Sequence, residues 1–169
     1  MAELWDILDE NSNKTGYLHE RGKPMRKGEY HLTVNVWIEN DNGEYLISQR
    51  APNKPMHPNL WECTGGNAIT GDDSLTTALK EVNEELGVIL EPQNGRIIKH
   101  RSRHCVCGHC LVDVWLFKQN VDISSVSLSP DETCDVMWAS SSEINRMIDK
   151  GTFTTWGLFT HVDELFEGG

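Results

Sequence analysis

Residues 66–88 read GNAITGDDSLTTALKEVNEELGV, and this stretch decides the fold. Its second half, 74–86, predicts an amphipathic helix, because apolar residues recur there at helical spacing and form one stripe. Side-chain oxygens over 72–74 can cap its start, and Gly87 suits the left-handed position that ends a helix. The stripe consists of Leu75, Ala78, Leu79, Val82 and Leu86.

A second face of the same helix is acidic. Glu81, Glu84 and Glu85 fall at i, i+3 and i+4, so their carboxylates converge beside the apolar stripe. Three like charges this close repel one another. A divalent cation removes the repulsion, because carboxylate oxygens are the ligands that Mg²⁺ prefers. The alternative is a solvated acidic face, which is the usual role of a charge run on a helix.

The neighbouring residues favour the metal-binding interpretation. A strand candidate, Leu60–Cys63, leads into the glycines at 65–66 and then into the helix. Gly66, five residues, Asp72, seven residues and KEVNEELGV from Lys80 together resemble the Nudix box of the Nudix hydrolase superfamily. That family has Glu and Arg where this chain has Asp72 and Lys80, so charge is kept but reach and bidentate geometry are not. In the family these two residues brace the loop against the helix.

The resemblance implies an enzyme that uses Mg²⁺, or alternatively Mn²⁺, to cleave a phosphoanhydride in a diphosphate joined to another moiety. Glu84 and Glu85 would bind the metal, Glu81 would be a further ligand or orient the others, and the carbonyl of Gly65 is a further candidate ligand. In the family, a loop Glu downstream of the box serves as metal ligand or general base, which suits Glu132. The proton of the attacking water would pass to Glu84, Glu85 or Glu132, and the sequence does not choose among them.

Two other side chains are candidates for substrate binding. Arg50 ends a strand before the loop that leads to the glycines, and its guanidinium could reach a substrate phosphate. A surface salt bridge is the alternative role for Arg50. Trp61 could stack on the substrate, although a Trp in this setting is more often part of the core.

A further resemblance covers roughly residues 28–75. This segment is similar to the corresponding part of isopentenyl diphosphate isomerases, which share the Nudix fold. It reads EYHLTVNVWIENDNGEYLISQRAPNKPMHPNLWECTGG. Those enzymes transfer protons with a Cys just after the Trp step and a Glu on a later strand. Here glycines occupy the Cys region, Cys63 is too close to Trp61 to align, and the strand at 111–114 has no Glu. We therefore expect a shared scaffold, and an isomerase or a catalytically weak ligand-binding module stays as the alternative.

Length and charge set the outer limits. The 169 residues suit one domain, 1–169, and the formal charge of −11 disfavours binding to a nucleic acid polymer. No apolar run approaches the ~20 residues of a membrane span, and no signal-like N-terminus is present, so we expect a cytoplasmic protein with a small-molecule diphosphate as its partner. Residues 1–30 predict an N-terminal hairpin extension, either an edge piece or a homodimer contact.

The pattern along the chain predicts an α/β protein. With the resemblance it indicates a Nudix-type α/β/α sandwich with a mixed β-sheet. Besides the helix at 74–86, we expect helices at 141–149, where Ser140 and Glu143 form a capping box, and at 155–166. The expected strands are 4–8, 15–19, 31–38, 45–49, 60–63, 88–90, 97–100, 111–117 and 136–139.

Residues 104–110 read HCVCGHC and are the most ambiguous segment. The five Cys of the chain are too unevenly placed for a disulfide framework. Zinc ligands could come from Cys105, Cys107, Cys110, His104 and His109, but there is no second CxxC. Redox chemistry at 107–110 would need a helix after the first Cys, whereas a strand follows. We favour an incidental Cys-rich hairpin. His31 could be a ligand, but a satisfied His at a strand end is the commoner case.

Overall fold

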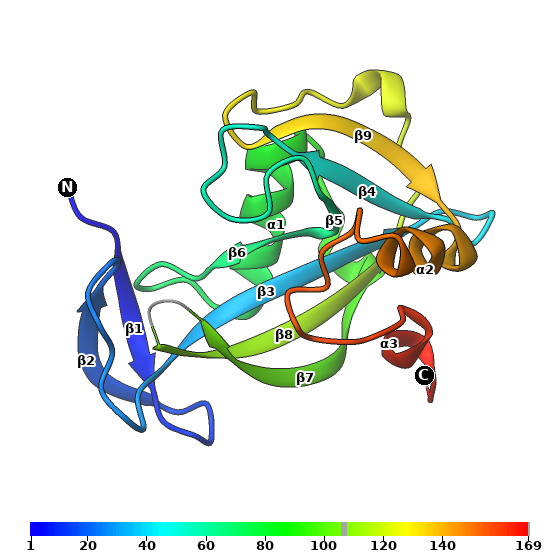
Figure 1. Ribbon diagram of the computed structural model, residues 1–169. Helices are drawn as coiled ribbons and strands as arrows, with labels where there is room; N and C mark the ends of the chain where they lie inside the picture. The colour runs from blue at the N-terminus through cyan, green and yellow to red at the C-terminus, as the bar shows by residue number, and fades with distance from the viewer. Residues whose placement is uncertain (106–107, 169) are drawn as a thin grey trace.

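A mixed β-sheet forms the middle layer of the molecule (Figure 1). The structure is a computed structural model and describes residues 1–105 and 108–168. Within these residues the strands are β1 (Leu4–Leu8), β2 (Lys14–Glu20), β3 (Tyr30–Glu39), β4 (Tyr45–Arg50), β5 (Trp61–Glu62), β6 (Thr64–Asn67), β7 (Gly95–Cys105), β8 (Gly108–Lys118) and β9 (Thr133–Ala139). The helices are α1 (Ser74–Leu86), α2 (Ser141–Asp149) and α3 (Asp163–Phe166), with short 3₁₀ turns at Pro92–Asn94 and Ile123–Ser125.

Strand β3 is the centre of the sheet. It runs parallel to β8 along its whole length, from the Tyr30–His109 pair to the Glu39–Lys118 pair. On its other side β6 pairs antiparallel with it. Strand β4 continues the sheet to β5 and β9, both antiparallel. The sheet therefore contains both kinds of pairing, as predicted.

Helix α1 covers one face of the sheet and has the bounds that the periodicity predicts. The side chain of Asp73 accepts a hydrogen bond from the Thr76 N–H, and Gly87 ends the helix at φ 64°. Ala78, Val82 and Leu86 are buried against the sheet. Each buried Val or Leu side chain stabilises the fold by roughly 1.5–3 kcal/mol, so this stripe holds α1 in place.

Helices α2 and α3 cover the opposite face (Figure 1). The predicted capping box of α2 is present, with Ser140 and Glu143 bonding each other's backbone N–H. Ile144 of α2 and Leu165 of α3 bury their side chains in a core built around Trp37. With α1 on the other side, the layers form the α/β/α sandwich that the sequence predicts.

Two local predictions are wrong. Residues 88–90 form no strand, because Val88 and Leu90 pack into the core under α1 and no ladder accompanies them. The helix expected at 155–166 is limited to α3. Trp156 has φ 54°, a left-handed conformation that ends a right-handed helix, and residues before it pair through their backbone with Trp61.

The glycines at 65–66 lie in strand β6. Strand β6 lies very close to β3, since a Cβ added to Gly65 would be 2.5 Å from the Val34 carbonyl oxygen. Only glycine allows this approach. The pairing carries the chain from the sheet directly into the turn before α1.

The N-terminal hairpin is formed by β1 and β2, as expected, and β1 joins the sheet through the Leu8–Tyr30 pair. Trp5 is buried and stacks on His31, with ring centroids 4.1 Å apart. The role of this hairpin in a homodimer stays a prediction. Across the described residues, no helix has the length and apolar character needed to cross a bilayer.

Candidate active site

A cleft with a volume of about 1300 Å³ opens beside α1, between β6 and the segments at 54–60 and 151–158. Most of the side chains that the sequence singles out line this cleft. They are Glu81, Glu84, Glu85, Glu132, Arg50 and Lys80, together with Gly65. Asp72 and Trp61 are not among the described residues that line it.

The acidic face of α1 points into the cleft, where carboxylates from three elements meet. Burial raises the pKa of Glu85 well above its usual value, and the charges of Glu62, Glu81 and Glu132 raise it further. Burial, and then the charge of Glu84, raises the pKa of Glu81 to about 7. This crowding of acids means that the ionised cluster is unstable without a cation.

In the part of the chain that the structure describes, the carboxylate of Glu85 lacks a partner for one of its oxygens. Its Oε2 atom is buried and has no hydrogen-bond partner among the described residues. A buried carboxylate oxygen without a partner is costly, and such groups coordinate a metal or pair with a cation. Several carboxylate oxygens at one place are the donor set that Mg²⁺ or Mn²⁺ takes. The side chains present therefore fit a hard divalent cation.

Gly66 makes room for one of these carboxylates. A Cβ added at Gly66 would overlap the carboxylate carbon and both oxygens of Glu81. The Glu81 carboxylate thus lies directly on the backbone of β6, next to Gly65. A glycine at this place is explained by close approach of a side chain rather than by an unusual turn.

Asp72 and Lys80 form an ion pair between the turn and α1. Lys80 Nζ lies 2.6 Å from Asp72 Oδ2. The Asp72 side chain is mostly buried and that of Lys80 is half exposed. An Asp and a Lys thus form an ion pair at the positions where the family pattern has Glu and Arg. The role of this pair in bracing the turn against α1 stays a prediction.

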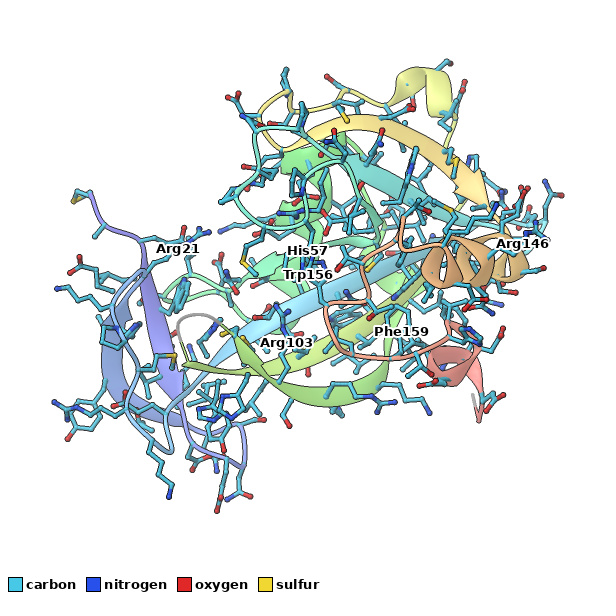
Figure 2. All side chains as sticks on the ribbon, in the orientation of Figure 1. Arg21, His57, Arg103, Arg146, Trp156 and Phe159 are labelled. Atoms are coloured by element: carbon cyan, nitrogen blue, oxygen red, sulfur yellow. The ribbon has the colours of Figure 1, made fainter. Side chains whose placement is uncertain are left out.

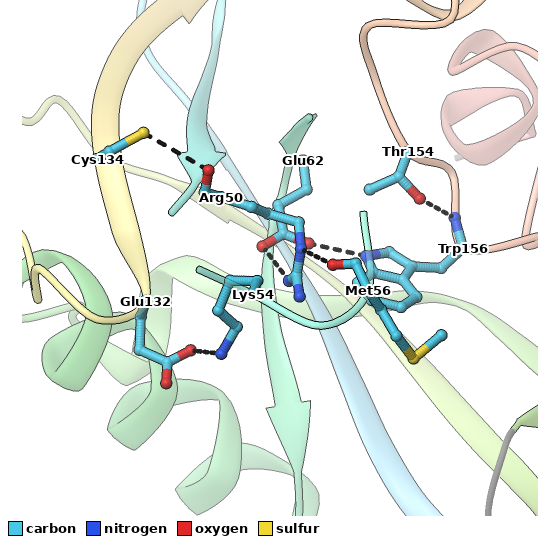
Figure 3. A network of polar contacts seen from close by, with 8 residues as sticks. All are labelled: Arg50, Lys54, Met56, Glu62, Glu132, Cys134, Thr154 and Trp156. Atoms are coloured by element: carbon cyan, nitrogen blue, oxygen red, sulfur yellow. Dashed lines mark hydrogen bonds and ion pairs between the residues drawn. The ribbon is translucent and has the colours of Figure 1, made fainter. Parts of the chain in front are cut away.

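A polar network forms the wall of the cleft that faces the 54–60 segment (Figure 3). Arg50 Nη1 binds Glu62 Oε1 at 2.9 Å, and Trp156 Nε1 donates to Glu62 Oε2 at 2.8 Å. The Arg50 guanidinium lies over the Trp156 ring, 4.8 Å from its centroid, and its Nε donates to the Met56 carbonyl. Arg50 is therefore held in place by the protein rather than free in solvent.

Two further cations reach the cleft. Lys54 forms an ion pair with Glu132, also drawn in Figure 3. Arg103 of β7 lies 5.1 Å from the Trp156 ring centroid, and His57 lies on the same indole (Figure 2). Among the described residues Arg103 has no carboxylate partner. Its Nη1 donates to the Trp156 carbonyl at 3.2 Å, and its Nε is buried without a hydrogen bond. Its charge is thus available to an anion in the cleft.

Trp61 lies away from the cleft. Its side chain packs against the core cluster under α2 and α3, and its backbone bonds residues 152 and 154. The indole that lies beside Arg50 and Glu62 in the cleft is that of Trp156, for which the sequence predicts a helical position. Glu62 is also missed, because nothing in the local pattern separates it from an ordinary strand residue. Alternation along β5 turns Glu62 toward the cleft and Trp61 away from it.

Comparison with protein families gives one clear assignment. The family model described as NUDIX domain matches residues 29–159. An uncharacterized Nudix hydrolase of Listeria innocua is 33% identical over 164 residues, which cover 96% of this chain and 95% of that protein. An isopentenyl-diphosphate Delta-isomerase of Pectobacterium atrosepticum is 28% identical, with 91% of this chain and 87% of that protein covered.

Solved structures show the same fold. A protein of Deinococcus radiodurans has a TM-score of 0.72 at 21% identity, and the match covers 90% of this chain and 92% of that one. A MutT protein of Methanosarcina mazei has a TM-score of 0.65 at 23% identity, covering 86% of this chain and 93% of that one. With the family model spanning most of the chain and the Listeria relative spanning nearly all of it, this protein belongs to the Nudix family.

Proposed function

We propose that this protein hydrolyses a phosphoanhydride bond in a diphosphate that is joined to a second moiety. The observation that carries the proposal is the buried, unpartnered Oε2 of Glu85 among neighbouring carboxylates. A structural acid would have a hydrogen-bond donor or would face water. A side chain left in this state in a cleft is a candidate for metal binding.

Glu81, Glu84 and Glu85 would hold the divalent cation, together with the backbone carbonyl of Gly65. A bound Mg²⁺ or Mn²⁺ would neutralise diphosphate oxygens and lower the pKa of a bound water. Glu132 comes from the loop before β9, and its ion pair with Lys54 places its carboxylate at the cleft. Glu84, Glu85 and Glu132 all stay candidates for the group that accepts the proton of the attacking water.

The remaining lining suits a diphosphate with an organic group. Arg103 offers a positive charge without a carboxylate partner among the described residues, and Arg50 presents a guanidinium fixed by Glu62. Apolar and aromatic side chains line the cleft next to them, including Met56, Phe153 and Trp156. The volume of about 1300 Å³ exceeds the ~300–1,000 Å³ of an ordinary ligand pocket, which leaves space for both halves of such a substrate.

The test is turnover with a panel of diphosphates in the presence of Mg²⁺. The panel contains nucleotide sugars, dinucleotides, nucleoside triphosphates, coenzyme A and isopentenyl diphosphate, and mass spectrometry follows the products. We expect cleavage of at least one compound by the native protein and its loss in Glu85→Gln. Equal turnover by the native protein and the variant would show that α1 is not the catalytic centre.

The second candidate is isomerisation of an isoprenoid diphosphate, because relatives across most of the chain carry that name. It predicts a rearranged product with unchanged phosphate content in the same experiment. Cys63 lines the cleft, but burial, and then the charge of Glu62, raises its thiol pKa well above the usual value. A protonated thiol is a poor base, which favours hydrolysis over an isomerase that uses Cys63.

A catalytically weak binding module would be stabilised by a diphosphate without turnover.

A further inference from the structure

A second group of metal-ligating side chains lies on the cleft wall, built from residues other than the carboxylates of α1. His31 is in β3, Cys105 ends β7 and Cys110 is in β8. Their ligand atoms, one from each residue, all lie within 4.8 Å of one another. All three residues line the cleft. The group is therefore formed by three strands that the sheet brings together.

The distances show how closely the three side chains converge. Cys110 Sγ is 3.1 Å from His31 Nε2, and Cys105 Sγ is 3.5 Å from the same nitrogen. The two sulfur atoms are 2.8 Å apart. Tetrahedral zinc with Zn–S bonds of about 2.3 Å separates two sulfurs by about 3.8 Å, so the thiols need to open by only about 1 Å to admit the ion.

The surroundings hold the ligands in place. Cys110 and His31 are buried, with about 1% of their surface exposed. The Trp5 ring stacks on the His31 imidazole and limits its rotation. Arg103 lies opposite Cys110 in the β7–β8 register. Without a metal, the hydrogen bond with Cys105 and burial raise the pKa of the Cys110 thiol, and the charge of Arg103 acts against that rise. Cys107, a further zinc-ligand candidate in the sequence, lies outside the described residues.

We propose that His31, Cys105 and Cys110 bind a soft divalent cation of the zinc class, at a site separate from the carboxylates of Glu81, Glu84 and Glu85. Two thiols and one imidazole select zinc over Mg²⁺, whose preferred ligands are oxygens. An ion there would join β3, β7 and β8 where they meet the N-terminal hairpin through Trp5. This wall of the cleft would then depend on zinc rather than on the ion of the carboxylate site.

The first experiment measures the metal content of the full-length protein after reduction, incubation with zinc and desalting. We expect about one zinc ion per chain, lost in His31→Gln, Cys105→Ser and Cys110→Ser. Cys134→Ser is the matched control, because this thiol is exposed on β9 and contacts Gln49 and the Arg50 carbonyl instead. Glu85→Gln is the second control and should keep its zinc, which separates this site from the carboxylates.

Cobalt gives a readout that does not depend on activity. Replacement of zinc by Co²⁺ should produce a thiolate-to-cobalt charge-transfer band in the native protein, in Glu85→Gln and in Cys134→Ser. Cys105→Ser should weaken the band, and circular dichroism of this variant checks that the sheet is intact. A native protein without zinc or the cobalt band overturns the proposal. So does zinc that survives all three ligand substitutions, or a thiol titration that finds a Cys105–Cys110 disulfide where zinc should bind.

Discussion

Glu62 and Trp156 are 94 positions apart in the chain, and the indole Nε1 of Trp156 donates a 2.8 Å hydrogen bond to Glu62 Oε2. Arg50 pairs with the other oxygen of the same carboxylate. Burial raises the pKa of Glu62, while Arg50 and Trp156 act against that rise. The carboxylate thus connects β4 and β5 to the segment after α2, and it sets the position of one wall of the cleft.

Trp156→Phe removes the indole donor and keeps an aromatic ring over Arg50. We expect the free energy of unfolding to fall by about 1–3 kcal/mol, because Glu62 Oε2 is left buried with no donor. Chemical denaturation measures the change. Trp138→Phe is the control, since Trp138 packs against the core under α1. A loss no larger in Trp156→Phe than in this control would contradict the role of the hydrogen bond.

Glu85→Gln replaces the crowded carboxylate by a neutral group of the same shape. We expect turnover of a cleaved diphosphate to fall by roughly 10²–10⁴-fold, the range typical of losing a catalytic acid or base. The stability of the metal-free protein should not fall, since a buried charge is removed. Steady-state kinetics and thermal denaturation with and without Mg²⁺ test both points. Glu10→Gln, at an exposed position in the β1–β2 turn, is the control.

Gly66→Ala tests the contact between β6 and Glu81. The added methyl group overlaps the Glu81 carboxylate, which is the flexible end of a side chain and can move aside. We therefore expect a folded protein with weaker Mg²⁺ binding and at least about tenfold lower turnover, the loss expected when a metal ligand is disturbed. Circular dichroism and Mg²⁺ titration measure the two effects.

A double-mutant cycle separates this cause from general damage to the strand. If Gly66→Ala acts by displacing the Glu81 carboxylate, it should have little further effect on turnover in the Glu81→Ala background. Losses that multiply in the double variant would mean that the methyl group harms the site by another route. The Gly65 position offers no such test, since a Cβ there meets backbone of β3 instead of a side chain.

Local sequence patterns were sufficient for α1 and α2. In α1, cap, apolar stripe and terminal glycine all agree, and the helix has the predicted bounds. The same holds for α2, where the capping box marks the start. Helical spacing alone predicts that the glutamates of α1 lie on one face. Where local signals agree with the tertiary packing, the sequence is enough.

Other parts of the site depend on contacts that no local pattern carries. Trp156 occupies the cleft because Thr154 pairs with Trp61 and because φ is positive at 156, and neither fact can be read from the apolar spacing of that segment. Glu62 is a cleft residue only through partners from two distant elements. The same applies to His31, which reaches Cys105 and Cys110 through pairing between β3, β8 and β7.

The pKa of Glu81 predicts how stability depends on pH in the absence of metal. The value rises from 4.5 to about 7 on folding, so the folded state holds a proton that the unfolded state has lost over this interval. The favourable contribution of that proton is complete below about pH 4.5 and is lost as the pH rises through about 7. In a chelating buffer, the free energy of unfolding should therefore decrease over this range, with a slope of up to about 1.4 kcal/mol per pH unit for one proton.

Glu81→Gln removes the titrating group and should flatten this slope, whereas Glu10→Gln should not change it. The stabilisation that saturating Mg²⁺ gives should increase with pH, because the cation binds the ionised carboxylates and competes with protons. Its stabilising effect should thus grow from about pH 5 to about pH 8. Denaturation curves at several pH values, with chelator and with Mg²⁺, measure both trends. A slope that is unchanged in Glu81→Gln would assign the proton to another group, with Glu85, whose pKa burial also raises, as the next residue to substitute.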